Sequence, residues 1–230
     1  MIEDDDGLMP PGFNGDEFVI SGGDLKYFHY EGEFQFEFNI LNSQLLEEVH
    51  INFYSPENGL MPVINNFLKL LRYTSDVPTL TLRNALCLLD MPEVVTQVPM
   101  FIGVRRLELD YETSDLSNKG LLMMLQNIPF LESLVFVEGI KMPSDPIEDD
   151  IWDPLPPCFL FPLYFIYVYI KKGDVKELMG VKVLLENAIA LVEMEIYFSE
   201  LVNKDIRNNF CVELLKLPRG SRHCGIYIRQ

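Results

Sequence analysis

The stretch LESLVF at residues 131–136 carries the pattern that decides the fold: an apolar residue, two others, an apolar residue, one other and a third apolar residue. A half-buried strand gives this alternation, because successive side chains point to opposite faces of a sheet. The same pattern recurs as Leu25/Phe28/Tyr30, Leu46/Val49/Ile51, Val77/Leu80/Leu82, Val104/Leu107/Leu109, Leu131/Leu134/Phe136, Leu163/Ile166/Val168 and Leu191/Met194/Ile196. Successive sets begin 21 to 32 residues apart, close to the roughly 20–29 residues of leucine-rich repeats. A shorter alternation, Cys224/Ile226/Ile228, follows near the end.

Helical patterns fill several intervals between these strands. Apolar residues at helical spacing mark residues 62–72, 121–128, 174–190 and 206–215. Asp174 suits an N-cap, because its carboxylate can accept hydrogen bonds from the first free N–H groups of the helix. Strands that alternate with helices at a near-constant period predict parallel strands joined by crossovers. The sequence therefore predicts an α/β fold, specifically a leucine-rich-repeat-like solenoid with parallel strands and crossover helices. The alternative is an ordinary α/β domain with coincidental spacing.

Charge and composition narrow the classes of partner and compartment. The 230 residues include 18 Lys plus Arg against 35 Asp plus Glu, a formal net charge of −17, which argues against nucleic-acid binding because that needs a basic stripe. The longest uncharged stretch, residues 154–170, contains four prolines and is shorter than the ~20 residues of a spanning helix, so we interpret it as a buried strand and expect no membrane contact. The acidic N-terminus is unlike a signal peptide, and the four cysteines are widely spaced. We expect a reduced, soluble protein of the cytoplasm or nucleus.

Motifs that carry chemistry are missing from the sequence. It contains no G-x-S-x-G, no phosphate-binding glycine loop and no H-E-x-x-H. We therefore expect no enzyme activity, no cofactor and no metal. Ser221 and His223 are interpreted as part of a turn before the last strand, with a hydrolase that uses this pair as the remote alternative. Trp152, beside a proline-rich segment, is expected to pack in the core or a cap rather than stack on a ligand.

One set of residues in the last third of the chain forms a recognisable pattern. The set consists of Trp152-Asp153-Pro154, Pro157-Cys158, Glu177, VLLENA at 183–188, Leu191, Met194, Ile196, LLKLPRGS at 214–221 and Cys224. With these residues the segment resembles the FBD domain of plant F-box proteins, and residues 107–136 are similar to the repeats of that family. The resemblance implies that leucine-rich repeats continue through the FBD segment. On this basis the chain divides into an acidic, glycine-rich tail (1–23), a leucine-rich-repeat-like region (24–141), an acidic proline-rich linker (142–151) and an FBD domain (152–230).

The family resemblance also implies a function. Members carry an F-box that docks to a Skp-type linker within a cullin-based ubiquitin ligase, while the repeats select the protein substrate. Here only about twenty residues precede the first repeat, without a run of leucines, so a Skp-type linker is not expected to bind this chain directly. We expect a non-catalytic protein-recognition module that resembles the substrate-binding half of such an adaptor. The alternatives are an interaction or structural module unconnected to ubiquitination, and a truncated, non-functional paralogue.

The residues between the inward-facing apolar positions predict the surface that a partner would contact. They would line the exposed, concave face of the sheet, polar and charged in its first half and aromatic in its second. The candidate partner-binding residues are Phe165, Tyr167, Tyr169, Glu193, Glu195, Tyr197 and Tyr227. We call the five aromatic members the aromatic band, and we expect it to bind a peptide or protein with basic character, because aromatic residues dominate interface hot spots. The alternative is that a loop, such as the acidic one before Trp152, covers it.

Overall fold

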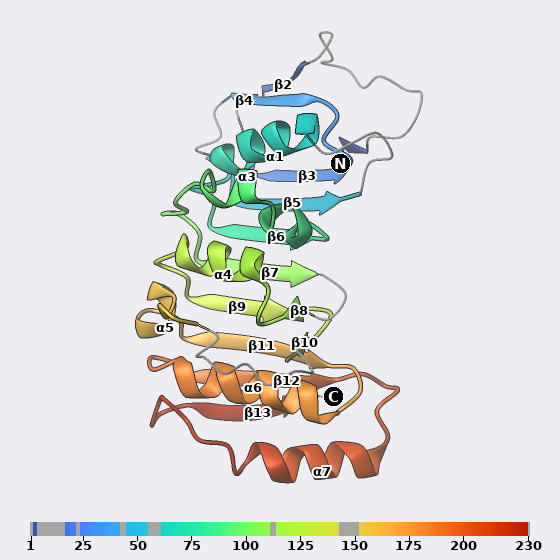
Figure 1. Ribbon diagram of the computed structural model, residues 1–230, viewed down its shortest axis with the longest axis vertical. Coiled ribbons are helices and arrows are strands. Elements are labelled where there is room, and N and C mark those ends of the chain that lie inside the picture. Colours follow the sequence, from blue (N-terminus) through green and yellow to red (C-terminus); the bar gives the residue numbers. More distant parts are fainter. Residues whose placement is uncertain are drawn as a thin grey trace.

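The computed structural model describes residues 2–3, 17–21, 24–41, 45–54, 61–110, 114–142 and 152–229. Within these ranges nine strands form one sheet, in which every pairing is parallel and the strand order follows the chain. The strands are β1 (Ile2–Glu3), β3 (Tyr27–Gly32), β5 (Glu48–Phe53), β6 (Thr79–Arg83), β7 (Arg106–Asp110), β9 (Ser133–Phe136), β11 (Phe165–Ile170), β12 (Glu193–Phe198) and β13 (Gly225–Arg229). Figure 1 shows them stacked along the long axis of the molecule. All eight strands predicted from the apolar pattern are present.

The crossovers between these strands carry the helices. They are α1 (Met61–Tyr73), α2 (Leu86–Leu89), α3 (Pro92–Val95), α4 (Lys119–Gln126), α5 (Pro157–Leu160), α6 (Val175–Asn187) and α7 (Lys204–Leu214). The helices of the described residues lie on one face of the sheet (Figure 1). On the opposite face, which we call the open face, outward residues such as Tyr27, Arg83 and Tyr169 are exposed. The four longer helices coincide with the four predicted helical patterns, so the prediction of an α/β fold with a large parallel sheet and crossover helices is confirmed.

Two short sheets lie beside the main one. In the first, β2 (Glu17–Ser21) pairs in parallel with β4 (Glu37–Leu41). β4 lies in the crossover between β3 and β5 and packs against α1, which follows β5. In the second, β8 (Ser114–Asp115) pairs with β10 (Ile140–Lys141). β1 and β2 both fall within residues 1–23; β1 belongs to the main sheet and β2 to the first short sheet. The apolar pattern did not predict them because β1 has two residues and, among Glu17, Phe18, Val19 and Ile20 of β2, only Phe18 is fully buried.

The core is continuous along the whole sheet. Of the residues in the seven repeated sets, all are buried except Leu25, which is partly buried against the same core. Trp152 is also in the core: its indole N–H donates to the carbonyl oxygen of Leu116 at 3.1 Å, and its ring centroid lies 4.5 Å from that of Phe159. The prediction of a packing role for Trp152 is therefore confirmed.

The uncharged stretch at 154–170 is divided between α5 and β11. The side chains of β11 alternate between buried and partly exposed positions, as predicted for a strand in a sheet with one covered face. No helix in the described part of the chain combines the length and apolarity needed to span a membrane.

Candidate functional site

The open face of the sheet is organised in rows, because the strands pair in register. Outward side chains of neighbouring strands therefore stand directly opposite one another. The middle row runs His29, His50, Thr81, Glu108, Val135, Tyr167, Glu195 and Tyr227; the row nearer the strand ends runs Glu31, Asn52, Arg83 and Asp110, and resumes as Tyr169, Tyr197 and Arg229. The predicted alternation of inward apolar and outward residues is confirmed by the burial pattern of β3, β7 and β11.

The structure brings the aromatic band together on three neighbouring strands, β11, β12 and β13. The rings of Tyr169 and Tyr197 stack with centroids 4.8 Å apart and planes at 14°. Tyr169 is 39% exposed and Tyr227 is 46% exposed, whereas Phe165, Tyr167 and Tyr197 are half-buried. The band is thus an accessible surface whose rings already support one another.

Two arginine side chains lie over aromatic rings of the band. The guanidinium carbon of Arg106 lies 5.4 Å from the centroid of the Tyr167 ring, and that of Arg229 lies 5.4 Å from the Tyr227 centroid. A cation over an aromatic face is attracted by the negative potential of the ring. Both arginines also pair with a glutamate, Arg106 with Glu108 and Arg229 with Glu195, so they add no surplus positive charge to the band.

The two glutamates of the predicted site have different roles. Glu195 is buried; its Oε1 accepts a hydrogen bond from Arg229 Nε at 3.0 Å, and its Oε2 accepts one from the Tyr197 hydroxyl. The hydrogen bond from Arg229 is the main reason that the pKa of Glu195 is lowered, and the bond to Glu195 raises the pKa of Tyr197 to about 12. Glu195 therefore positions Tyr197. Glu193 is half-exposed and forms no ion pair with a described residue, although its side chain interacts with that of Glu195, so it is the more accessible of the two carboxylates.

Comparison with known proteins gives no match. No family model, no curated protein and no solved structure is similar to the chain. Function is therefore inferred from the side chains of the open face.

The loop after β11 positions the band through one buried carboxylate. Glu177 is 2% exposed and accepts backbone N–H bonds from Lys171 at 2.8 Å, Lys172 at 3.1 Å, Gly173 at 2.7 Å and Asp174 at 3.3 Å. The Asp174 side chain in turn accepts from Glu177 N at 3.0 Å, which completes a capping box and confirms Asp174 as the N-cap of α6. This clamp fixes the end of β11, where Tyr169 lies. The spacing of Asp174 and Glu177 was the sequence signal that could have predicted it.

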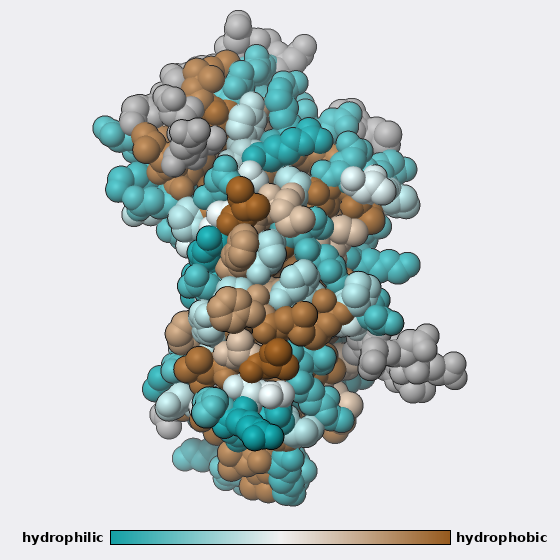
Figure 2. Space-filling model, turned by 90° about the vertical axis from the view of Figure 1, so that its left-hand side faces the viewer, coloured by the Kyte–Doolittle hydropathy of each residue, from teal (hydrophilic) through white to brown (hydrophobic). Residues whose placement is uncertain are grey.

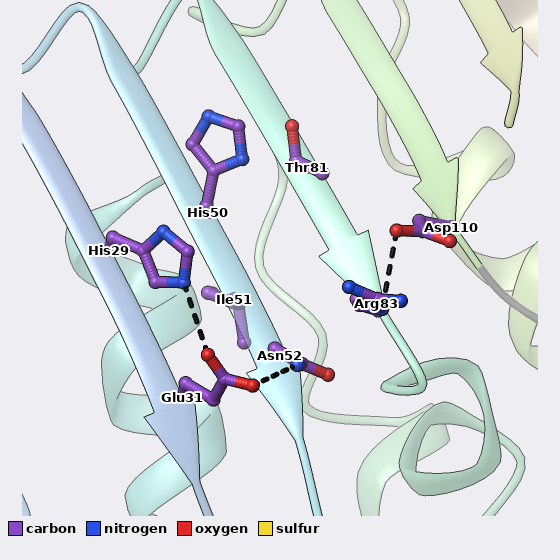
Figure 3. Close-up of a pocket in the computed structure, with 8 residues that line it drawn as sticks. All are labelled: His29, Glu31, His50, Ile51, Asn52, Thr81, Arg83 and Asp110. Atoms are coloured by element: carbon purple, nitrogen blue, oxygen red, sulfur yellow. Dashed lines mark hydrogen bonds and ion pairs between the residues drawn. The ribbon is translucent and has the colours of Figure 1, made fainter. Parts of the chain in front are cut away.

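A polar pocket on the first half of the open face was missed by the sequence analysis. Eight residues of β3, β5, β6 and β7 line it: His29, Glu31, His50, Ile51, Asn52, Thr81, Arg83 and Asp110 (Figure 3). The rings of His29 and His50 stack with centroids 5.7 Å apart. The volume of the pocket is about 100 Å³. This is enough for a small polar group but not for a drug-sized ligand, which needs about 300 Å³ or more.

A second apolar surface lies at the edge where the strands begin. Figure 2 shows apolar side chains gathered there among polar ones. Exposed residues in the turns that lead into β7, β9, β11 and β12 include Ile102, Phe130, Phe161 and Ile189. This edge is distinct from the open face, so it is a rival surface that an experiment on the aromatic band must control for.

The remaining candidates for chemistry have structural roles. Ser221 is buried, and its Oγ accepts a bond from the backbone N–H of His223 at 3.3 Å, whereas His223 itself is exposed. The pair lies in a turn before β13, as predicted. In the described residues, no cluster of three His, Cys, Asp or Glu side chains could hold a metal ion. The acidic loop at 143–151, which was considered as a cover for the aromatic band, lies outside the described residues.

Proposed function

We propose that the chain is a non-catalytic protein-recognition module that binds a peptide or protein with basic character through the aromatic band. The observation that carries the proposal is the accessible, stacked pair Tyr169 and Tyr197 beside the exposed Tyr227, on a face that the helices leave open. Exposed aromatic surfaces of this kind mark interaction sites, and aromatic anchors dominate binding energy. Glu193 supplies a half-exposed carboxylate for a cation of the partner.

The proposed architecture is a leucine-rich-repeat-like solenoid with a C-terminal FBD segment. It is supported by the strand order, which follows the chain, and by the recurrence of one apolar pattern at each strand. Under this proposal the module resembles the substrate-binding half of an F-box adaptor, and it would act in the cytoplasm or nucleus. An interaction module unconnected to ubiquitination would use the same surface.

The test of the band is the double variant Tyr169→Ala with Tyr227→Ala. Both side chains lie on the open face outside the core, so the double variant should remain folded, with about 0.5–1.5 kcal/mol lost from the stacking of Tyr169 on Tyr197. Each aromatic anchor contributes roughly 2 kcal/mol, so each loss should weaken partner binding about 30-fold. Affinity capture followed by mass spectrometry should identify proteins that the parent chain retains and the double variant loses, and titration of each purified protein measures the affinity.

Two control variants make this experiment specific. Tyr27→Ala removes an aromatic side chain that is 65% exposed on the same face but at the far end of the sheet, and Phe161→Ala removes one that is 66% exposed at the strand-start edge. Both should retain the partner. Loss with Phe161→Ala but not with the double variant would move the site to the edge, and recovery of every partner by the double variant would refute the proposal.

A purified Skp-type linker separates the ligase-related interpretation from the general one. We expect no binding of this linker to the chain, because the F-box pattern is missing from the sequence. Measurable binding would show that the chain contains the docking half as well.

A further inference from the structure

The polar pocket on β3, β5, β6 and β7 is formed by side chains of unequal length. Asn52 and Thr81 are short and nearly buried, and they form its floor. The stacked rings of His29 and His50 form one wall, and Arg83, which pairs with Asp110 at 3.3 Å, forms the other (Figure 3). The in-register neighbours are longer, His50 and Glu108 beside Thr81 and Glu31 and Arg83 beside Asn52, so the two short side chains leave a hollow between them.

Two polar atoms in this pocket have no hydrogen-bond partner among the residues that the structure describes. One is Oγ1 of Thr81, on a residue that is only 8% exposed, and the other is Nε2 of His29. The nearest carboxylate to that nitrogen, on Glu31, lies 3.7 Å away, beyond hydrogen-bond distance. Burying a polar group without a partner costs about 1–3 kcal/mol. A native structure therefore leaves such atoms in a hollow where a water molecule or a ligand can satisfy them.

The other polar groups of the pocket are largely occupied. The Asn52 amide donates to Glu31 Oε1 at 2.8 Å, and its oxygen accepts from the Asn84 amide at 3.2 Å. Arg83 uses Nε for its ion pair with Asp110, and its side chain is 54% exposed, so its terminal N–H groups remain accessible. The groups left for a ligand are thus the Thr81 hydroxyl, the His29 nitrogen and the terminal donors of Arg83.

The charge of the pocket selects the class of ligand. Glu31 and Asp110 carry two negative charges against the single positive charge of Arg83, so the net charge is −1 with the histidines neutral, as in the formal count. A carboxylate or phosphate would add to this negative charge. A cation would face Arg83, and the pocket carboxylates already accept hydrogen bonds or ion pairs. A neutral group with both a donor and an acceptor on one small plane meets these constraints, and a carboxamide is such a group.

We propose that this pocket binds the carboxamide of an asparagine or glutamine side chain on the polypeptide that contacts the open face, which rests on the proposed function. The carboxamide oxygen accepts hydrogen bonds from the Thr81 hydroxyl and from the terminal N–H groups of Arg83, and its NH₂ donates to His29 Nε2. Four strand-to-strand steps separate Thr81 on β6 from Glu193 on β12, which is roughly 19 Å at 4.8 Å per step. An extended segment covers that distance in about six residues. The partner segment should therefore carry Asn or Gln about six residues from Lys or Arg.

Nuclear magnetic resonance of the histidine rings tests this proposal directly. The chain has three histidines, of which His29 and His50 line the pocket and His223 lies in the turn before β13 and serves as an internal reference. The probe is N-acetylglutamine N-methylamide, with the matched glutamate and lysine compounds as controls. We expect the glutamine probe to shift the ring signals of His29 and His50 but not of His223, with a dissociation constant on the order of 1 mM, as for ligands of this size.

Variants at one position separate a hydrogen bond from a general change in shape. Thr81→Val removes the hydroxyl at nearly constant volume and should weaken the probe about fivefold, the loss of one hydrogen bond of about 1 kcal/mol. Thr81→Ser keeps the hydroxyl and should retain binding. Thr79→Val, two residues earlier on the same strand, is the matched control and should leave the dissociation constant unchanged.

The outcomes distinguish this proposal from the proposed function. Absence of His29 and His50 shifts, equal shifts with the glutamate or lysine compound, or an unchanged dissociation constant for Thr81→Val would each overturn the carboxamide site, while the test of the aromatic band would stand. Conversely, if the aromatic variants retain every partner but the glutamine probe binds as expected, the carboxamide site is upheld and the proposed function fails.

Discussion

Replacing Glu177 tests whether a single buried carboxylate holds the end of β11 and, through it, the aromatic band. The two variants are Glu177→Ala, which removes the acceptor, and Glu177→Gln, which keeps the shape but exchanges one carboxylate oxygen for an NH₂ group. Both leave backbone N–H groups of residues 171–174 without an acceptor. The loop is then expected to loosen, and Tyr169 at the end of β11 is expected to lose its fixed position.

The size of the effect follows from the four N–H groups that Glu177 accepts. A hydrogen bond to a charged acceptor contributes about 1.5–3 kcal/mol. Lys171 and Gly173 are half-buried and make the shortest of these bonds, 2.8 and 2.7 Å, whereas Lys172 and Asp174 are exposed and can turn to water. Counting the first two alone, Glu177→Ala should cost about 3–6 kcal/mol and Glu177→Gln about half of that. A domain stability of about 5–15 kcal/mol makes either loss large.

Urea unfolding of the full chain, followed by circular dichroism, measures this cost. With a dependence of about 3 kcal/mol per molar urea, suited to a chain of this length, the midpoint should fall by about 1–2 M for Glu177→Ala and 0.5–1 M for Glu177→Gln. The control is Glu186→Gln on the same helix, whose carboxylate is partly exposed and lies 3.7 Å from Lys182. Such a pair contributes less than about 0.5 kcal/mol. The reasoning is refuted if Glu177→Gln shifts the midpoint no more than Glu186→Gln does.

Two further predictions concern ionisable side chains. The pKa of Glu195 lies below its ordinary value of 4.5 because Arg229 donates a hydrogen bond to it. The contribution of Glu195 to stability is therefore complete above pH 4.5 and is lost as the pH falls through the lowered pKa. Between pH 7 and pH 3 the melting temperature of Glu195→Gln should fall less than that of the parent chain, and an equal fall would contradict this. Burial raises the pKa of Cys158 to about 12, whereas Cys87 is exposed. A thiol reagent at pH 8 should therefore label Cys87 in the folded chain and Cys158 only on unfolding, as measured by peptide mass spectrometry. Labelling of Cys158 in the folded chain would show that its surroundings open.

Burial is the property of this fold that could be predicted from the sequence, because it leaves a direct trace in the residue pattern. A strand with one covered face must alternate, and Leu107 with Leu109 or Ile166 with Val168 shows that alternation. The longer helices repeat apolar residues at their own period. Helices of four residues, such as α2, α3 and α5, are too short to show a helical period. Strands of two residues, such as β8 and β10, show no alternation either.

Contacts across strands could not be predicted in the same way, because the intervals between strands differ in length and the register is set by packing. The sequence analysis assigned Glu195 to partner binding because it occupies an outward position on β12, whereas the register places Arg229 within hydrogen-bond reach of it. The polar pocket likewise depends on how the residues of neighbouring strands are aligned. Its floor is formed by the short side chains of Asn52 and Thr81, which lie on two neighbouring strands next to longer side chains. The sequence of one strand alone could not predict this arrangement.

The arginines of the open face connect its two halves to the charge of the whole chain. Arg83, Arg106 and Arg229 each pair with an acidic residue of the same face, so the positive charges of that face are used within the molecule. The whole chain has a formal net charge of −17, and the paired arginines add no surplus positive charge beside the exposed aromatic rings and Glu193. A field of that sign attracts a basic partner over distances of about 10 Å at ordinary ionic strength and raises its association rate. Aromatic contact then supplies the affinity. The polar pocket, whose proposed carboxamide ligand is uncharged and gains nothing from that field, supplies the choice among basic partners.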